Sequence, residues 1–282
     1  MKSVRANGVD FAYLEQGTGP LVVLLHGFPD TAHTWEPTMA ALAAAGYRAV
    51  APFMRGYFPT TIPAGGNYDS DTLGRDALAL IDALGGPAIL VGHDWGASAA
   101  YSAAGLGPEK LRLLVTLAIP HPQSLKLTPK LMWSLRHFAA LRSNSAPARI
   151  RATDYAYVDE LWRRWSPAWK QIPASETAEA KACFAHPGVL EAACGYYRAL
   201  SPRLPPGQKV KITVPAVAFA GEDDGLIVPR MYEKARHNFT KSYEVVQVPG
   251  GHFMHREHPE VFIPELVKVL KSHETRAASS AL

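Results

Sequence analysis

The 282-residue sequence predicts an α/β protein in which a mostly parallel sheet is interrupted by a helical insertion. Short runs rich in Val, Ile and Leu alternate with longer segments of helical spacing, and this alternation is typical of β-α-β units. The strand-like runs disappear between positions 122 and 210 and then resume. The predicted strands cover residues 21–26, 47–52, 88–93, 111–118, 214–221 and 243–250.

The segments between these strands carry apolar residues at helical spacing, which predicts helices that cover the sheet. Two of them, residues 36–45 and 73–84, are followed by Gly46 and Gly85, and glycine commonly terminates a helix. A final helix is predicted from about Pro259. We expect residues 273–282, HETRAASSAL, to form a flexible tail.

The interruption has a composition of its own. Trp133, Trp162, Trp165 and Trp169 gather there, and a proline-rich stretch at residues 201–207 closes it. The sequence therefore predicts the first part of an α/β core, a helical insertion, the second part of the core and the tail. Their predicted bounds are 1–121, 122–210, 211–272 and 273–282.

Charge and composition exclude several classes of partner. The net charge of +4 is spread among acidic residues without a long Lys/Arg block, so we expect no nucleic acid to bind. No apolar run approaches the ~20 residues of a membrane span. The N-terminal MKSVRANGVD lacks the apolar stretch of a secretory signal, which predicts a cytoplasmic protein. Cys183 and Cys194 are expected to be reduced thiols.

The most informative motif follows the predicted strand that ends at His93. Gly92-His93-Asp94-Trp95-Gly96 places a nucleophile-type residue between small ones, before the helical sequence ASAAYSAAG. Small residues are needed there because the backbone turns so sharply that a side chain would collide with neighbouring elements. Serine is the residue expected at the apex of such a turn, and here it is Asp94. The alternative is that Asp94 only caps the helix that follows.

Three further motifs also follow predicted strands. The motif HGFP at 26–29 comes after the first of them, and GEDD at 221–224 and GGHF at 250–253 come after the last two. Nucleophile, acid and histidine thus succeed one another along the chain, each after a strand, which is the order found in one class of hydrolases. This agreement argues against a mere helix cap at Asp94.

Together, HGFPD, RGY, GHDWGA, PHP, GEDDGLIVP and GGHFMHREHP resemble the epoxide hydrolase and dehalogenase branch of the α/β-hydrolase superfamily. The resemblance covers nearly the whole chain. It implies an α/β-hydrolase fold, with an eight-stranded sheet flanked by helices and a helical cap inserted after the sixth strand. It also implies hydrolysis of a small apolar epoxide or halogenated substrate by water, and we expect no cofactor and no metal ion.

The resemblance assigns Asp94 as the nucleophile, His252 as the base and Asp224 as the acidic partner of the histidine. Glu222 and Asp223 stand beside Asp224 and are the alternatives for that partner. A carboxylate is ionised at neutral pH and needs no base to attack carbon. His252 would therefore serve the second step, in which it deprotonates a water that attacks the ester of Asp94.

Two other parts of the reaction need hydrogen-bond donors. Backbone N–H groups of Phe28 and Trp95 would stabilise the oxyanion that forms during ester hydrolysis. An epoxide oxygen leaves as an alkoxide that needs a proton, whereas a halide leaves without one. In CGYYRA, which resembles a cap motif of epoxide hydrolases, Tyr197 matches this proton donor. The alternative is that Tyr197 only packs within the cap.

A second donor is expected earlier in the cap, within the segment WSLRHFAAL, but Ser134 occupies its position. His137, Tyr155 and Tyr157 are the candidates to replace it, and each could instead be a packing residue. Together with Trp133, these residues make up the predicted substrate pocket.

Other functions stay open at this stage. A haloacid or haloalkane dehalogenase would hold its halide with N–H groups such as the indole of Trp95. Against these enzymes, no Arg follows Asp94 to bind a carboxylate, and HGFP has no Asn to bind a halide. A ligand-binding relative without catalysis is a third hypothesis. The intact set of Asp94, Asp224 and His252 argues against it. The oligomeric state is left open, a homodimer included.

Two more motifs have structural interpretations. His252, His255 and His258 recur every three residues, but the first is assigned to catalysis and the stretch contains the turn into the last helix. We therefore expect no metal site from this spacing. The motif RGY at 55–57 is expected to be a structural turn.

Overall fold

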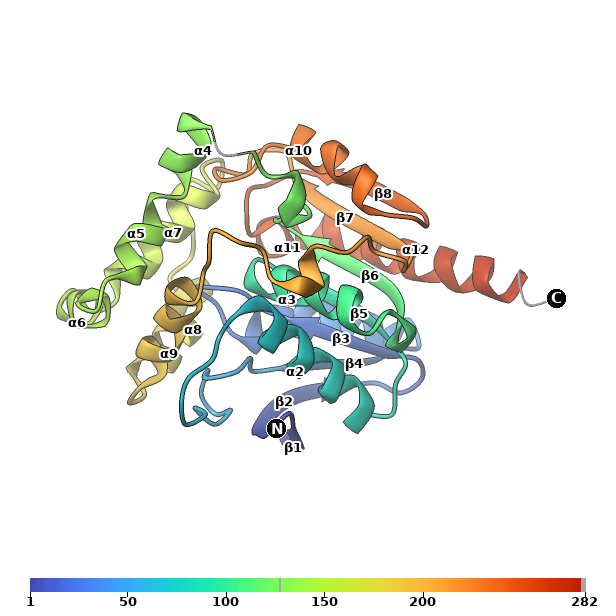
Figure 1. The fold of residues 1–282 in the computed structure, drawn as a ribbon, viewed down its shortest axis with the longest axis horizontal. Coiled ribbons are helices and arrows are strands. Elements are labelled where there is room, and N and C mark those ends of the chain that lie inside the picture. The colour runs from blue at the N-terminus through green and yellow to red at the C-terminus, as the bar shows by residue number, and fades with distance from the viewer. Residues whose placement is uncertain (127, 280–282) are drawn as a thin grey trace.

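The computed structural model describes residues 1–126 and 128–279, and its centre is an eight-stranded sheet with helices on both faces (Figure 1). The strand order is β1-β2-β4-β3-β5-β6-β7-β8, in which the six strands from β4 to β8 run parallel. This confirms the predicted mostly parallel sheet. The strands are β1 Lys2–Ala6, β2 Val9–Gln16, β3 Leu21–Leu25, β4 Arg48–Pro52, β5 Ala88–His93, β6 Leu111–Leu117, β7 Ala216–Gly221 and β8 Tyr243–Val248.

The N-terminal hairpin of β1 and β2 was not among the strands predicted by position. The two strands pair antiparallel, and β2 continues antiparallel onto β4 at this edge of the sheet. Asn7 and Gly8 join them, with φ values of 43° and 76°. Asn-Gly is the favoured pair for a two-residue hairpin turn, because both residues accept a positive φ. The sequence therefore contained the signal for this hairpin.

Two layers of helices cover the sheet. α2 and α3 pack against each other on one face, and α1 packs with α12 on the other. α2 begins three residues earlier than predicted because Asp69 caps it, accepting a 2.9 Å hydrogen bond from the Thr72 backbone N–H. The helices of the core are α1 Glu36–Ala44, α2 Ser70–Ala83, α3 Trp95–Leu106, α10 Arg230–Glu233, α11 Met254–Glu257 and α12 Pro259–Ser279.

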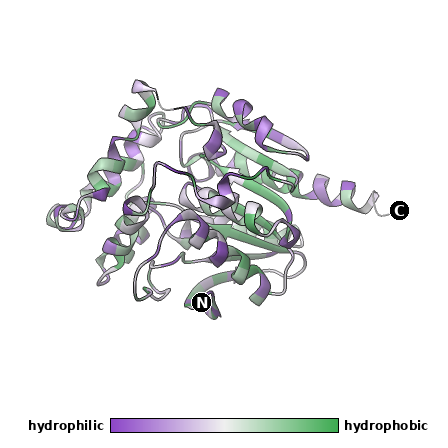
Figure 2. Cartoon of the chain, in the orientation of Figure 1, coloured by the Kyte–Doolittle hydropathy of each residue, from purple (hydrophilic) through white to green (hydrophobic). Residues whose placement is uncertain are grey.

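Apolar residues concentrate on the central strands (Figure 2). β3, β5 and β7 are buried along their whole length, as expected for parallel strands covered on both faces. Among the helices of the described residues, none is both long enough and apolar enough to span a membrane.

The helices between β6 and β7 form a layer to one side of the sheet, at the left of Figure 1. This confirms the predicted cap after the sixth strand. The cap lies over the edge at which the parallel strands end, where loops of an α/β protein form ligand sites. Its helices are α4 Pro129–Ser134, α5 Arg136–Arg142, α6 Ala146–Ala152, α7 Ala156–Trp165, α8 Ser175–Ala185 and α9 Val189–Arg198.

The cap is attached to the core by buried side chains of two of its helices. The indole of Trp162 in α7 donates a 3.2 Å hydrogen bond to the Pro29 carbonyl and stacks on Phe253 at a centroid distance of 3.8 Å. The hydroxyl of Tyr196 in α9 donates a 2.7 Å hydrogen bond to the Arg55 carbonyl. Because these partners lie in loops at the strand ends, the cap and the loops support each other.

The segment from residue 273 differs from the predicted flexible tail. α12 continues through it as far as Ser279, and residues 280–282 lie outside the described part of the chain. Glu274 accepts hydrogen bonds from the Tyr47 hydroxyl at 2.9 Å and from the Arg112 guanidinium at 3.1 Å. These bonds connect the end of the helix to the core, which the polar composition of the segment did not reveal.

Arg55, in the predicted structural turn, forms a buried ion pair with Asp76. Its Nε and Nη2 atoms each donate a 2.6 Å hydrogen bond to one carboxylate oxygen, and the two side chains are only 7% and 6% exposed. Arg5 and Asp10 form a similar pair on the surface, with 67% and 52% of their side chains exposed. The two pairs allow a direct comparison of a buried and an exposed ion pair.

We expect Arg55→Met to lower the free energy of unfolding by about 3–5 kcal/mol, because the buried carboxylate of Asp76 would lose its charged partner. The matched change Arg5→Met should lower it by about 1 kcal/mol or less, since water solvates Asp10. Urea unfolding followed by circular dichroism measures both. Equal losses in the two variants would contradict this account of the turn.

Candidate active site

Asp94 stands at the apex of a sharp turn between β5 and α3. Its backbone has φ 52° and ψ −114°, a conformation that is strained for a residue other than glycine. A Cβ atom on Gly92 would lie 2.3 Å from the Gly96 carbonyl oxygen, and one on Gly96 would lie 2.3 Å from the Leu25 carbonyl oxygen. The small residues of the motif are therefore required by close packing, as the sequence predicted.

The Asp94 carboxylate makes no capping hydrogen bond to α3, which argues against the helix-cap alternative. Its Oδ1 accepts a 2.9 Å hydrogen bond from the Phe28 backbone N–H, and its Oδ2 lies 3.3 Å from Nε2 of His252. A Cβ atom on Gly27 would lie 2.6 Å from Oδ1, so glycine is needed there for the loop to approach the carboxylate. The carboxylate is thus held between the HGFP loop and the histidine.

The two backbone N–H groups predicted for the oxyanion belong to the HGFP loop and to the residue that follows Asp94. Phe28 already donates to Asp94 Oδ1. Trp95 is the first residue of α3, where backbone N–H groups have no carbonyl partner within the helix. The positive end of the helix dipole also favours negative charge at this position.

His252 connects Asp94 to a second carboxylate. Its Nδ1 lies 3.0 Å from Asp224 Oδ2, and Oδ1 of Asp224 accepts hydrogen bonds of 2.7 Å and 3.2 Å from the backbone N–H groups of Leu226 and Ile227. Of the three adjacent acids, the structure brings Asp224 to the histidine, while Glu222 and Asp223 are exposed. The Asp224 carboxylate is thus held by backbone donors and in turn holds the imidazole in one orientation.

One cap residue that the sequence analysis did not assign to the site holds the loop of Asp224 and the loop of His252. The backbone carbonyl of Trp165, at the end of α7, accepts hydrogen bonds from the Gly225 N–H at 3.1 Å and the His252 N–H at 2.9 Å. The Trp165 ring also packs against the His252 ring with centroids 5.1 Å apart. A backbone acceptor leaves no signature in a sequence, so only the folded chain identifies it.

The charges of the site favour an ion pair in the resting protein. Burial alone would lower the pKa of His252, but the charges and hydrogen bonds of Asp224 and Asp94 outweigh it and raise this pKa to about 9. Burial acts to raise the pKa of Asp94, and the neighbouring His252 outweighs it and lowers this pKa. At neutral pH the pair is therefore Asp94 carboxylate and His252 imidazolium.

Tyr197 of α9 is buried beside Asp94. Its ring contacts Phe28 and Trp95 edge to face, with centroids 5.3 Å and 5.2 Å apart. Burial and the nearby charge of Asp94 raise the pKa of Tyr197 well above its ordinary value. The hydroxyl is therefore protonated at neutral pH and can donate its own hydrogen to a group bound next to Asp94.

His137 of α5 also borders this space, with its ring centroid 5.8 Å from that of Tyr197. Its Nδ1 lies 3.3 Å from the Ser134 carbonyl, which can only accept, so Nδ1 carries the hydrogen. Burial lowers the pKa of His137 to about 3, although the charge of Asp94 acts in the opposite direction. The ring is therefore neutral, and its Nε2 is an acceptor rather than a donor.

The structure does not bring the other predicted pocket residues together in the same way. Trp133 is 70% exposed and lies under the Arg136 guanidinium, so its assignment to the pocket is not supported. The Tyr155 hydroxyl donates to a backbone carbonyl of the cap at 3.5 Å. Tyr157 lines an outer groove between α5, α6 and α7. Ser134 is half-buried at the end of α4, where its carbonyl holds His137.

Residues 20–259 match the family model described as alpha/beta hydrolase fold, and the chain belongs to this family. It is 30% identical to the AB hydrolase superfamily protein YfhM of Bacillus subtilis (strain 168), over 95% of this chain and 97% of that protein. It is 29% identical to a protein named epoxide hydrolase from Caballeronia sordidicola, over 95% of this chain and 93% of that one.

Solved structures agree with these relatives. Epoxide hydrolase VrEH1 from Vigna radiata is 27% identical, with a TM-score of 0.81 over 96% of this chain and 97% of that one. The fold and these relatives make the chain an enzyme of the epoxide hydrolase-like type, which confirms the family predicted from the sequence motifs.

The ion pair at the site leads to a prediction about His252. We expect Asp94→Asn to lower the pKa of His252 below its value of about 9, because one of the two carboxylates that raise it would lose its charge. Titration of the His252 ring by heteronuclear NMR measures this pKa, with intact mass confirming that the amide has not hydrolysed. The exposed Glu222→Gln is the control and should leave the pKa unchanged. An unchanged pKa in Asp94→Asn would mean that the two residues do not interact electrostatically.

Proposed function

We propose that this enzyme converts a small apolar epoxide into a vicinal diol through an ester formed on Asp94. One observation carries the proposal: a buried, ionised carboxylate stands at the turn apex, with His252 Nε2 3.3 Å away and the buried Tyr197 close enough for the charge of Asp94 to raise its pKa. A nucleophile, an acid for the leaving oxygen and a base for water thus lie in one space. The names of the epoxide hydrolase relatives support the same substrate class.

In the first step, Oδ2 of Asp94 attacks a ring carbon while Oδ1 stays bound to the Phe28 N–H. The ring C–O bond breaks, its electron pair moves to the oxygen, and this oxygen takes the Tyr197 proton. The His252 imidazolium then gives up the proton that restores the Tyr197 hydroxyl. The products of this step are a hydroxyalkyl ester of Asp94 and a neutral imidazole.

In the second step, the neutral His252 takes a proton from water, and the hydroxide oxygen adds to the ester carbonyl carbon. The oxyanion on Oδ1 lies next to the N–H groups of Phe28 and Trp95, which stabilise it. When the intermediate collapses, the bond from the Asp94 carboxyl carbon to the alkyl oxygen breaks, and this oxygen takes the proton of the added hydroxyl group. The diol leaves, and Asp94 is again a carboxylate beside the His252 imidazolium, which Asp224 stabilises. Because esterification removes the charge of Asp94, the pKa of His252 falls when a base is needed.

The surroundings of the carboxylate indicate an apolar substrate. Phe28, Phe138 and Trp95 surround the Tyr197 ring, with centroid distances of 5.2–5.5 Å. One feature favours the epoxide over the dehalogenase alternative: the protonated Tyr197 hydroxyl supplies the proton that only an alkoxide needs.

His252→Gln should trap the ester, since attack on the epoxide needs no base whereas hydrolysis does. After incubation with styrene oxide, intact mass spectrometry should show protein heavier by the whole mass of the epoxide. A haloalkane substrate would instead add its mass less that of the hydrogen halide. Peptide mapping should place the adduct on Asp94.

The matched control is His258→Gln, which changes a partly exposed histidine and should turn over without accumulating an adduct. Adding Asp94→Asn to His252→Gln should abolish the adduct. If an epoxide consumed by the wild type leaves His252→Gln unmodified, the proposed division of roles is wrong.

Tyr197→Phe should slow ring opening by about 10²–10⁴-fold, the usual contribution of a positioned acid, because the neighbouring His137 presents an acceptor rather than a donor. The single-turnover rate of alkylation in the His252→Gln background isolates this step. Tyr155→Phe is the matched control, since that hydroxyl binds a cap carbonyl, and its rate should stay within about twofold of the parent protein, far short of a general-acid effect. Equal rates in the two variants would reject Tyr197 as the acid.

A further inference from the structure

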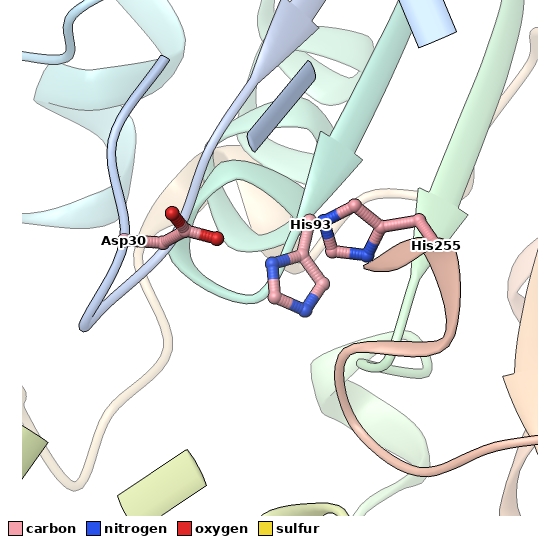
Figure 3. A group of neighbouring side chains, drawn as sticks. All are labelled: Asp30, His93 and His255. Atoms are coloured by element: carbon pink, nitrogen blue, oxygen red, sulfur yellow. The ribbon is translucent and has the colours of Figure 1, made fainter. Parts of the chain in front are cut away.

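A second cluster of titratable side chains lies behind the reacting face of Asp94. Asp30 comes from the loop after β3, His93 is the last residue of β5, and His255 belongs to α11 (Figure 3). They are 4%, 0% and 1% exposed. One oxygen or nitrogen atom of each lies within 4.8 Å of those of the other two, and Figure 3 shows the carboxylate directed toward the two rings. The mechanism above uses none of these side chains.

The hydrogen on His93 can be assigned from its partner. Its Nε2 lies 2.9 Å from the His252 backbone carbonyl, and a carbonyl only accepts, so Nε2 carries the hydrogen. In the neutral ring Nδ1 is then a bare lone pair. This Nδ1 is fully buried and has no hydrogen-bond partner among the described residues.

The same reasoning applies to His255. Its Nε2 lies 2.9 Å from the hydroxyl of Thr34, in the short 3₁₀ helix Ala32–Trp35. A hydroxyl oxygen can accept the hydrogen of His255 Nε2, and in that tautomer Nδ1 of His255 is also a bare lone pair. It is buried without a partner among the described residues, as is Oδ2 of Asp30.

Each of the three clustered side chains thus has a buried oxygen or nitrogen atom without a hydrogen-bond partner among the described residues. We propose that Asp30 Oδ2, His93 Nδ1 and His255 Nδ1 bind a divalent transition-metal ion of the Zn²⁺ class. Two imidazole nitrogens and one carboxylate oxygen suit Zn²⁺, Co²⁺ or Ni²⁺ rather than Mg²⁺ or Ca²⁺. Three protein ligands would leave a coordination position for water.

The hydrogen bonds around the cluster fit this assignment. A histidine that ligates a metal usually donates its other N–H to an oxygen, which fixes the ring orientation. His93 does so with the His252 carbonyl and His255 with Thr34. Asp30 is held in a similar way, because its Oδ1 accepts a 2.8 Å hydrogen bond from the Thr31 backbone N–H. The site is therefore oriented before any ion enters it.

The spacing of histidines in the sequence pointed to a different group. Of His252, His255 and His258, only His255 belongs to the cluster. His252 is bound to Asp224, and His258 binds Glu260 at 3.0 Å near the surface. The other two ligands, Asp30 and His93, come from the first half of the chain. An ion would connect a loop, the end of β5 and α11, and it would bind only the folded protein, so it should stabilise the fold.

The test measures metal binding by the full-length chain without an affinity tag. After incubation with Zn²⁺ and desalting, elemental analysis should find about one ion per chain, as for a single three-ligand site. Zn²⁺ should also raise the thermal midpoint. His255→Gln and Asp30→Asn should lose both effects, whereas the control His258→Gln should keep them. Co²⁺ bound to the wild type should show visible absorption bands of a site with nitrogen ligands.

The proposal is overturned if the folded wild type retains no Zn²⁺, or if both variants bind as the wild type does. A water molecule and a proton on Asp30 would then satisfy the three atoms. If circular dichroism shows that one of the two variants does not fold, Zn²⁺ binding by the other variant decides the test. If both fail, absence of the Co²⁺ bands in the wild type rejects the site. None of these measurements depends on epoxide turnover, so the result is independent of the proposed function.

Discussion

The strained backbone of Asp94 is the constraint on which the rest of the site depends. A φ of 52° at a residue with a side chain persists only where packing over-determines it, and the contacts of Gly92 and Gly96 with neighbouring backbone do so here. The turn lifts the carboxylate off the end of β5 and out of the helix-capping position. It therefore faces the loops that follow β3 and β8, from which Phe28 and His252 reach it.

The cap contributes to the positions of the reacting groups as well as to the walls of the pocket. The carbonyl of Trp165 receives the backbone N–H groups of Gly225 and His252, so one peptide group of the cap holds the loops of both the acid and the histidine. Trp162 ties the same helix to the HGFP loop through the Pro29 carbonyl. A shift of α7 would therefore also move the loops that carry Asp224 and His252.

The electrostatics of the site agree with the order of steps in the proposed mechanism. In the resting protein the Asp94 carboxylate keeps His252 protonated. In the proposed mechanism, esterification would remove the charge of Asp94 and leave Asp224 as the remaining carboxylate partner of His252. The pKa shifts of His252 and Asp94 both depend on burial, because a neighbouring charge changes a pKa far more in a space of low polarity than in water.

The sequence by itself determined the features that depend on a single element and its neighbours along the chain. These are the alternation of strands and helices, the Gly-flanked turn at Asp94 and the order of nucleophile, acid and histidine along the chain, each after a strand. Parallel strands end at one edge of a sheet, so these residues had to meet. Only the tertiary structure decided how the cap helices are rotated, which buries Tyr197 and His137 and leaves Trp133 exposed. It also brought Asp30 to His255 across the chain, because contacts between distant segments depend on packing that no local pattern encodes.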